Sequence, residues 1–394
     1  MEVEFSPLEG KSPQFRAFLL VLFAVAGAGL LATYLFYARG LHLTGLSNRV
    51  PWGISIVMAI FYIGLSAGSL VLAAISVLSS KKEFKPFARV ATLLAMLLLI
   101  GGLLSIILDW GRPDRLFVPF LYFNPTSMFS LNGILYSSYI AICFVFLLAM
   151  FTGKEKLVSA MAVIAVICAI VVRSGTGVIF GFVPRELLQS PLLPPSFIAT
   201  ALSSGTALLI LLVPLLFRYT GRPFDERFVR KLSKLLVLLI IAAVYFVFLE
   251  NSFRAYTPAS RAAEWYLLFS GPHSMLFWLG LIGAGVLIPA AILFNPGTKN
   301  SVKMINIAAA LHVIGVLCEK YLAVVPAQTH AADILPNMHV ESVALDGAAV
   351  GYSITLLEAV QALGIAAMIA IAFILGLRFF AMLPTKALIE DEAS

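Results

Sequence analysis

The chain has 394 residues, of which 61% are apolar and only 12% are charged, and its net charge is +7. Soluble domains carry about 25% charged and about 45–50% apolar residues, so this composition excludes a water-soluble globule and a disordered chain. Nucleic-acid binding is not indicated, because the basic residues lie in short loops between long apolar blocks. Blocks of about twenty apolar residues have the length of membrane-spanning helices.

The apolar blocks predict an all-α polytopic membrane protein that forms one integral domain, residues 1–394. In sequence order, the predicted helices cover 15–38, 53–79, 87–110, 127–151, 157–183, 196–218, 231–250, 270–294, 302–325 and 352–381. Most Lys and Arg residues lie in the loops that share a side with the termini. The positive-inside rule therefore predicts a cytoplasmic membrane protein with both termini in the cytoplasm.

Four features recur in the same order and predict two parallel four-helix repeats, 53–183 and 196–325, flanked by helices 15–38 and 352–381. Each repeat contains a small-residue stretch, a basic residue twenty positions before an acidic one, a Pro-x-Ser-Met turn and a pair of basic residues. They are Gly64–Ser69 and Ala201–Thr206, Arg89 with Asp109 and Arg230 with Glu250, Pro125–Met128 and Pro272–Met275, and Lys156 with Arg173 and Lys303 with Lys320.

Ionisable side chains are costly inside a membrane, and here they gather toward the non-cytoplasmic ends of the predicted helices. The group comprises Asp109, Arg173, Glu250, Glu319, Lys320 and Glu358, with Asn132 and Tyr136 at the start of the fourth helix and His312 deeper in the ninth. Carboxylates that exchange protons, beside Tyr and Asn that hydrogen-bond carbonyls, fit a quinone. Bis-histidine haem b is not predicted, since His312 is the one deep histidine, and the separated cysteines predict no metal site or iron–sulfur cluster.

Roles follow from these positions. Asp109 is the leading candidate for accepting a proton, and Arg173 would favour its ionised form and polarise a carbonyl. Glu250 and Lys320 would form either a proton route or an ion pair left from the duplication, and the second is favoured. Glu319, His312 and Glu358 are candidates for proton transfer. Structural roles remain open alternatives. They are helix capping for Asp109 and Glu250, a structural ion pair for Arg173 and Glu358, and simple packing for His312.

Three motifs resemble the NrfD/polysulfide-reductase family of membrane subunits. They are Pro51-Trp52-Gly53, the block from Leu108 to Arg115 (LDWGRPDR) and Asn124–Met128 (NPTSM). The ten-helix length resembles the branch that includes membrane subunits of hydrogenase-2-type, Hme and Dsr complexes, and within it a DsrP-type subunit. In that family's motif the acidic residue falls on Asp109 and an arginine on Arg112. Some relatives carry quinone-contacting polar residues in the first helix, whereas this protein offers His42 just beyond it.

The resemblance implies a subunit without haem or iron–sulfur cluster that exchanges electrons between menaquinone and an extracytoplasmic ferredoxin-like iron–sulfur subunit. A multihaem cytochrome c and further membrane or cytoplasmic redox subunits are other implied partners, in sulfur- or sulfite-linked anaerobic respiration. Such a subunit would have no activity alone. The quinone would contact Tyr136, Asn132, His42 and Arg112. An ion or proton transporter and a passive membrane anchor for redox subunits are the alternative functions.

Overall fold

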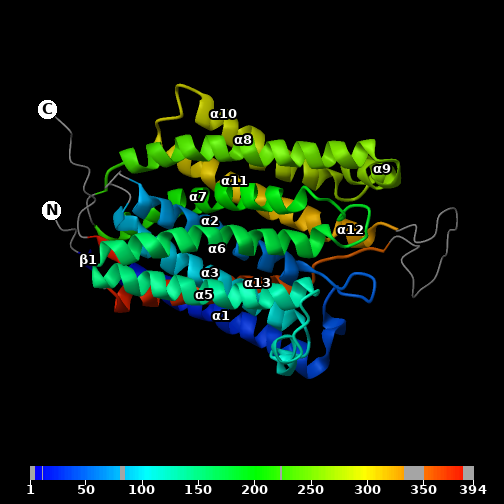
Figure 1. Cartoon of the computed structure of the whole chain (residues 1–394), viewed down its shortest axis with the longest axis horizontal. Coiled ribbons are helices and arrows are strands. Elements are labelled where there is room, and N and C mark those ends of the chain that lie inside the picture. The colour runs from blue at the N-terminus through cyan, green and yellow to red at the C-terminus, as the bar shows by residue number, and fades with distance from the viewer. Residues whose placement is uncertain (1–4, 11, 80–84, 222–223, 332–349, 385–394) are drawn as a thin grey trace.

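The computed structural model describes residues 5–10, 12–79, 85–221, 224–331 and 350–384 (Figure 1). Within these residues, ten helices are long and apolar enough to span a membrane, which confirms the all-α polytopic fold. They are α1 (Pro13–Arg39), α2 (Ile54–Leu78), α3 (Ala88–Asp109) with the preceding turn η2 (Lys85–Phe87), α5 (Met128–Thr152), α6 (Glu155–Gly181), α7 (Leu193–Thr220), α8 (Arg227–Tyr256), η5 (Leu276–Leu287) continued by α10 (Ile288–Phe294), α11 (Val302–Val324) and α13 (Leu356–Phe379).

Short elements connect these helices: η1 (Leu41–Leu43), η3 (Pro113–Arg115), α4 (Val118–Leu121), α9 (Pro258–Trp265), η4 (Tyr266–Ser270) and α12 (Pro326–Thr329). The largest errors in the predicted bounds concern α8 and the helix after it. Helix α8 continues to Tyr256, six residues beyond its predicted end. The next helix begins at Leu276, because Gly271 and Pro272 interrupt the backbone after η4, and its first part is a π-helix.

Helix α2 lies at the centre of the molecule and is the most buried of the spanning helices. It packs against α3, α6 and α7, while α1 pairs with α13 at the edge. We call α2, α3, α5 and α6 the first unit, and α7, α8, η5–α10 and α11 the second unit. These two groups correspond to the predicted repeats, and the duplication itself stays a prediction.

The two units meet where α2 and α7 carry their smallest side chains. A Cβ atom on Gly68 would collide with the Ala201 carbonyl, and one on Gly205 would collide with the backbone of Gly68. Small residues allow membrane helices to approach this closely. Both glycines lie in the small-residue stretches that suggested the repeat, so the matched positions face each other across the interface.

The first and last described segments lie together at one end of the bundle (Figure 1). Strand β1 (Phe5–Ser6) pairs antiparallel with β2 (Leu383–Pro384). Beside them, the Arg89 guanidinium donates hydrogen bonds to the carbonyls of Ala381 and Met150, at 3.1 and 2.7 Å. The opposite end carries α9, α12 and the end of α3, and we call it the Asp109 end.

Candidate functional site

A cavity of about 260 Å³ opens at the Asp109 end of the first unit, between α2, α3, α5 and α6. Its walls are aromatic and branched aliphatic side chains, and its polar groups include Asp109, Tyr136 and Thr176. Pockets for small organic ligands measure about 300–1,000 Å³, with apolar walls and a few polar groups. This cavity therefore accommodates a small ring system and leaves no room for a long hydrocarbon tail.

Asp109 is the last residue of α3 and is half-buried at the cavity wall. The Ser55 side chain from the first turn of α2 lies close to its carboxylate. The Ser55 hydroxyl donates a hydrogen bond to Oε1 of Gln361 at 3.4 Å, and Nε2 of Gln361 donates to the Thr33 hydroxyl at 3.1 Å. Buried polar side chains from α1, α2 and α13 thus form a row that leads away from Asp109.

Tyr136 faces the same cavity from α5, and its hydroxyl lies 3.0 Å from that of Thr176 on α6. Asn132, one turn earlier, does not line the cavity. Its Nδ2 instead donates to the carbonyls of Met128 and Gly175, at 2.8 and 3.1 Å. The sequence placed both side chains at the site, whereas the structure brings Tyr136 to the cavity and uses Asn132 to join α5 to α6.

Arg173 is fully buried but does not line the Asp109 cavity. Its guanidinium donates to the carbonyls of Phe197 and Ile60, at 2.9 and 3.1 Å, and lies over the Phe197 ring. The Lys320 ammonium lies over the same ring, 3.9 Å from its centroid, and donates to Thr200 at 2.9 Å. The two basic residues matched in the repeat thus meet at one aromatic ring between the units.

Glu250 forms an ion pair with Arg254, one turn further along α8, at 2.7 Å. Arg254 also pairs with Glu264 of α9 at 2.7 Å, and all three side chains are buried. The expected Glu250–Lys320 ion pair is not the pairing observed, since Lys320 pairs with its neighbour Glu319. Glu250 therefore ties α8 to α9 through Arg254.

Two small cavities follow each other through the second unit. One of about 40 Å³ is lined by Glu250, Arg254 and Glu319, and one of about 20 Å³ by Glu319, Thr200 and His312. The His312 ring binds the Gly285 carbonyl through Nδ1 at 2.7 Å, and its Nε2 has no hydrogen-bond partner among the described residues. A water molecule needs about 10–15 Å³ and polar partners, so the cavity beside Glu250 and Arg254 can hold water.

The Glu358 carboxylate joins the segment that follows α1 to the segment that precedes α13, beside Asp109. It accepts hydrogen bonds from the Tyr352 hydroxyl at 3.0 Å and from the backbone N–H groups of Gly45 and Thr355, at 3.0 and 2.9 Å. Burial, together with the nearby Glu358 carboxylate, raises the pKa of Tyr352 well above its usual range, so its hydroxyl stays a donor. That hydroxyl in turn accepts from the N–H of Ile54, at 2.8 Å.

Sequence reasoning missed Tyr352 and Gln328, which hydrogen-bond to the backbone at the start of α2 and just before it. The Gln328 side chain from α12 accepts from the N–H of Trp52 and donates to its carbonyl, both at 3.0 Å, and Trp52 is a cavity wall. No local pattern marks either residue. The spacing of Thr355 and Glu358 is the signature of a helix capping box, which the structure contains, and this signal was available.

His42 and Arg112 do not line the cavity. His42 is exposed in η1. Arg112 is exposed and forms a two-pronged pair with Asp114, with both N–O distances 3.0 Å. This pairing lowers the pKa of Asp114, so both exposed side chains remain charged.

A family model described as polysulphide reductase, NrfD, matches residues 42–332. The protein belongs to this family. It is 39% identical to the Hdr-like menaquinol oxidoreductase integral membrane subunit of Archaeoglobus fulgidus, over 99% of both sequences. It is 25% identical to the C subunit of the polysulfide reductase of Wolinella succinogenes, over 72% of this protein and 96% of the relative. It is also 25% identical to the menaquinone reductase integral membrane subunit of Nitratidesulfovibrio vulgaris, over 82% and 83%.

These comparisons confirm the family indicated by the Trp52, Asp109 and Asn124 motifs. The relatives are membrane subunits of redox proteins, so a redox partner is implied for this member of the NrfD family. Among the described residues, no three His, Cys, Asp or Glu side chains lie close enough to hold a metal ion. The expectation that the protein holds no haem or iron–sulfur cluster stays a prediction.

Proposed function

We propose that this protein exchanges electrons between menaquinone and a separate iron–sulfur subunit, as the membrane subunit of a respiratory redox complex. The observation that carries the proposal is the cavity at the Asp109 end, where one carboxylate and one tyrosine line the same space among apolar walls. Two relatives are named for menaquinol or menaquinone chemistry. The cavity volume suits the two-ring headgroup of a quinone, with its tail extending into the bilayer.

Oxidation of a quinol releases two electrons and two protons. In our proposal the Asp109 carboxylate accepts the first proton, because it lines the cavity without a cationic partner among its described contacts. The hydroxyl pair of Tyr136 and Thr176 hydrogen-bonds to the other quinol oxygen, whose proton leaves to solvent at the Asp109 end. The electrons pass to the iron–sulfur subunit. The reverse reaction uses the same groups, and the potential of the partner decides its direction.

Proton movement beyond Asp109 has two candidate routes. Glu358 is close enough to Asp109 to act on it electrostatically and is the next carboxylate on the side of the first unit. In the second unit, Glu250, Glu319 and His312 border the two small cavities and would pass protons through bound water. This second route also favours proton conduction as an alternative function for the protein.

The remaining predicted residues take supporting parts in this proposal. Asn132 joins α5 to α6, and Arg173 joins α6 to α2 and α7 and places a positive charge near Tyr136. Arg112 and His42 are exposed at the Asp109 end, where they would contact the quinone only during its entry or contact the partner subunit.

The membrane orientation completes the proposal. The excess of Lys and Arg on the side of the termini supports both termini in the cytoplasm. The Asp109 end then faces the extracytoplasmic side, where a ferredoxin-like iron–sulfur subunit docks and passes electrons on, for example to a multihaem cytochrome c. We infer a sulfur- or sulfite-linked anaerobic pathway in the cytoplasmic membrane.

The test uses membranes that contain the intact complex. A reduced menaquinol analogue is added, and reduction of the partner's iron–sulfur or haem centres is followed by absorption and electron paramagnetic resonance spectroscopy. We expect reduction that is lost in Asp109→Asn. Centres that accept electrons from dithionite but never from the quinol would overturn the proposal in favour of a passive anchor or a transporter.

A further inference from the structure

The connection between α3 and α5 carries an unusual run of exposed apolar side chains. From Leu116 to Phe123 the sequence is LFVPFLYF, with no charged residue. The exposed fraction is 66% for Phe117, 75% for Leu121 and 79% for Tyr122. Water-facing loops rarely present contiguous apolar side chains of this size, so this surface requires a partner.

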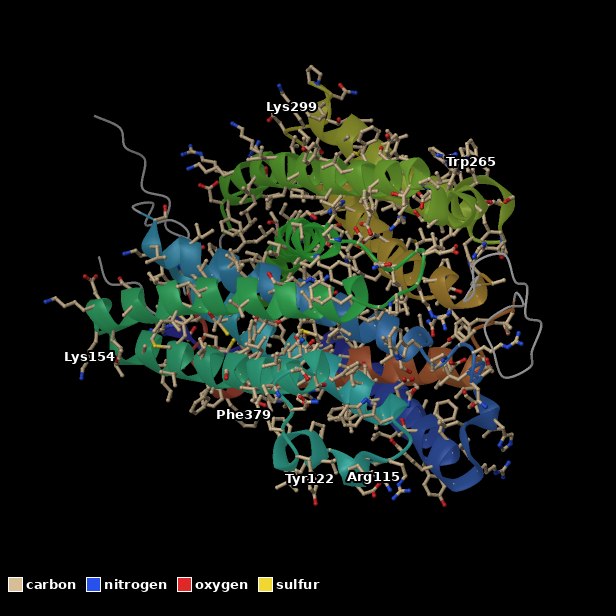
Figure 2. All side chains as sticks on the ribbon, turned by 45° about the vertical axis from the view of Figure 1, so that its right-hand side comes forward. Arg115, Tyr122, Lys154, Trp265, Lys299 and Phe379 are labelled. Atoms are coloured by element: carbon tan, nitrogen blue, oxygen red, sulfur yellow. The ribbon has the colours of Figure 1, made fainter. Side chains whose placement is uncertain are left out.

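The position of the segment indicates which partner. In Figure 1 the cyan turns of the short helix α4 lie beside the spanning helices, below α5, and not beyond their ends. Figure 2, turned by 45°, places Arg115 and Tyr122 on the same lateral projection. A soluble partner would dock on the end of the bundle, whereas the flank of a membrane protein faces lipid.

One side of the segment is fixed to the protein. Phe120 packs on Gly133 of α5, where a side chain at Gly133 would come within 3.3 Å of the ring. The opposite side is formed by Phe117 and Leu121, one helical turn apart, with Tyr122 next to them. Helix α5, on which the segment packs, exposes Ile134 and Phe144 along its outer face, as a lipid-facing helix does. The apolar surface is therefore continuous with the lipid-facing wall.

The chemistry of the segment matches the membrane interface. Aromatic side chains concentrate where acyl chains meet headgroups, and basic side chains nearby reach the phosphates. Arg112 and Arg115 precede the apolar run, and both are exposed. Exposed aromatics at the same end of the second unit, Trp265 and Phe269, are typical of the same interfacial layer.

We infer that residues 116–123 lie in the plane of the membrane as an interfacial anchor, in the leaflet at the Asp109 end. The cavity opens beside this anchor. Trp110, just before the connection, and Phe129, just after it, both line the cavity and are 38% and 52% exposed. A quinone headgroup that enters from that leaflet passes between these two rings, under the edge of the anchor. This entry path rests on the proposed function, whereas the anchor itself does not.

The anchor is tested by spin labelling, which needs no quinone chemistry. A nitroxide is attached to Tyr122→Cys and, as a matched control in the same connection, to Asp114→Cys, with labelling of the three native cysteines measured in the parent protein. The full-length protein is studied in phospholipid nanodiscs, alone and with its co-purified partner subunits. We expect the label at Tyr122 to relax more with oxygen than with a water-soluble nickel complex, and the label at Asp114 to show the reverse order.

Two results would overturn the anchor: a Tyr122 label as accessible to nickel as the control, or one that loses nickel accessibility only when partner subunits are bound. The second result would assign the surface to a protein partner. The entry path has its own readout, because Leu121→Glu places a charge at the interface and is expected to raise the quinol KM while kcat is kept. An unchanged KM together with a lipid-embedded label would reject the entry path and retain the anchor.

Discussion

Replacement of Asp109 by Asn gives the sharpest test of the cavity, because the two side chains have the same shape. Asparagine keeps one acceptor oxygen and replaces the other by an NH2 donor, so the change removes the negative charge and the basicity at almost constant volume. A positioned general base contributes about 100- to 10,000-fold to a rate. At about 1.4 kcal/mol per factor of ten, this corresponds to about 3–5.5 kcal/mol of transition-state stabilisation.

Folding is not expected to suffer in this variant, since Asp109 is half-buried and no ion pair joins it to a described residue. The matched control is Asp114→Asn, which removes a carboxylate five residues later on the same connection. Asp114 is exposed and pairs only at the surface with Arg112, an interaction worth about 0–1 kcal/mol. The control is expected to keep wild-type turnover.

The assay is steady-state oxidation of a menaquinol analogue by the complex, with the amount of assembled complex measured in the same membranes. The expected result is a fall in kcat of about 100-fold or more in Asp109→Asn at normal assembly. Turnover equal to that of the wild type would remove Asp109 from the mechanism. An equal loss in both variants would assign the effect to the structure of the connection.

Three further variants examine other parts of the structure. Tyr136→Phe removes one hydrogen-bonding hydroxyl, worth about 0.5–1.5 kcal/mol, and should lower quinol kcat/KM by about 2- to 12-fold in the same assay. Glu264→Gln leaves Arg254 with a weakened buried partner, and breaking such a pair costs up to about 3–5 kcal/mol. A lower thermal unfolding midpoint is therefore expected. An unchanged midpoint would contradict the buried network. Gly205→Val forces a side chain into the backbone of Gly68, so little folded protein should reach the membrane on size-exclusion analysis, in contrast to Gly27→Val at an open position on α1.

The number and order of the spanning helices could be predicted because each is a block of apolar residues as long as the bilayer is thick. The predicted end of α8 is wrong because polar residues follow Glu250, and a run of polar residues favours a loop. The helix continues because Glu250 and Arg254, four residues apart, pair on one face. With the helix truncated at 250, Arg254 could not be recognised as the partner of Glu250.

The candidate site could be predicted in part. Asp109 and Tyr136 reach the cavity because both lie inside helices whose geometry fixes their direction. Arg112 does not, because Gly111 adopts a left-handed conformation with φ of +65° and turns the backbone away after α3. No rule based on spacing predicts the direction after such a turn. Gln328 and Tyr352 act on residues more than 270 positions away, so local sequence holds no sign of them.

Six buried ionisable side chains form a continuous network between the cavity wall and the second unit. Burying an isolated charge is costly. Here the three cations Arg173, Lys320 and Arg254 lie near three carboxylates, which belong to Glu319, Glu250 and Glu264. The network is neutral as a whole but begins with Arg173, which interacts electrostatically with Tyr136. The end beside the cavity is therefore positive, and the end at α9 is negative.

This polarity changes the expected role of Arg173. The guanidinium acts on the side of the cavity that carries Tyr136, where a positive charge stabilises negative charge on a quinone oxygen. Arg173→Met removes the charge and is expected to lower quinol turnover, while Arg173→Lys keeps it and should retain more activity than Met, although it loses hydrogen bonds to the carbonyls of Phe197 and Ile60. Equal activity in the Met and Lys variants, measured at equal assembly, would mean that Arg173 only joins the two units.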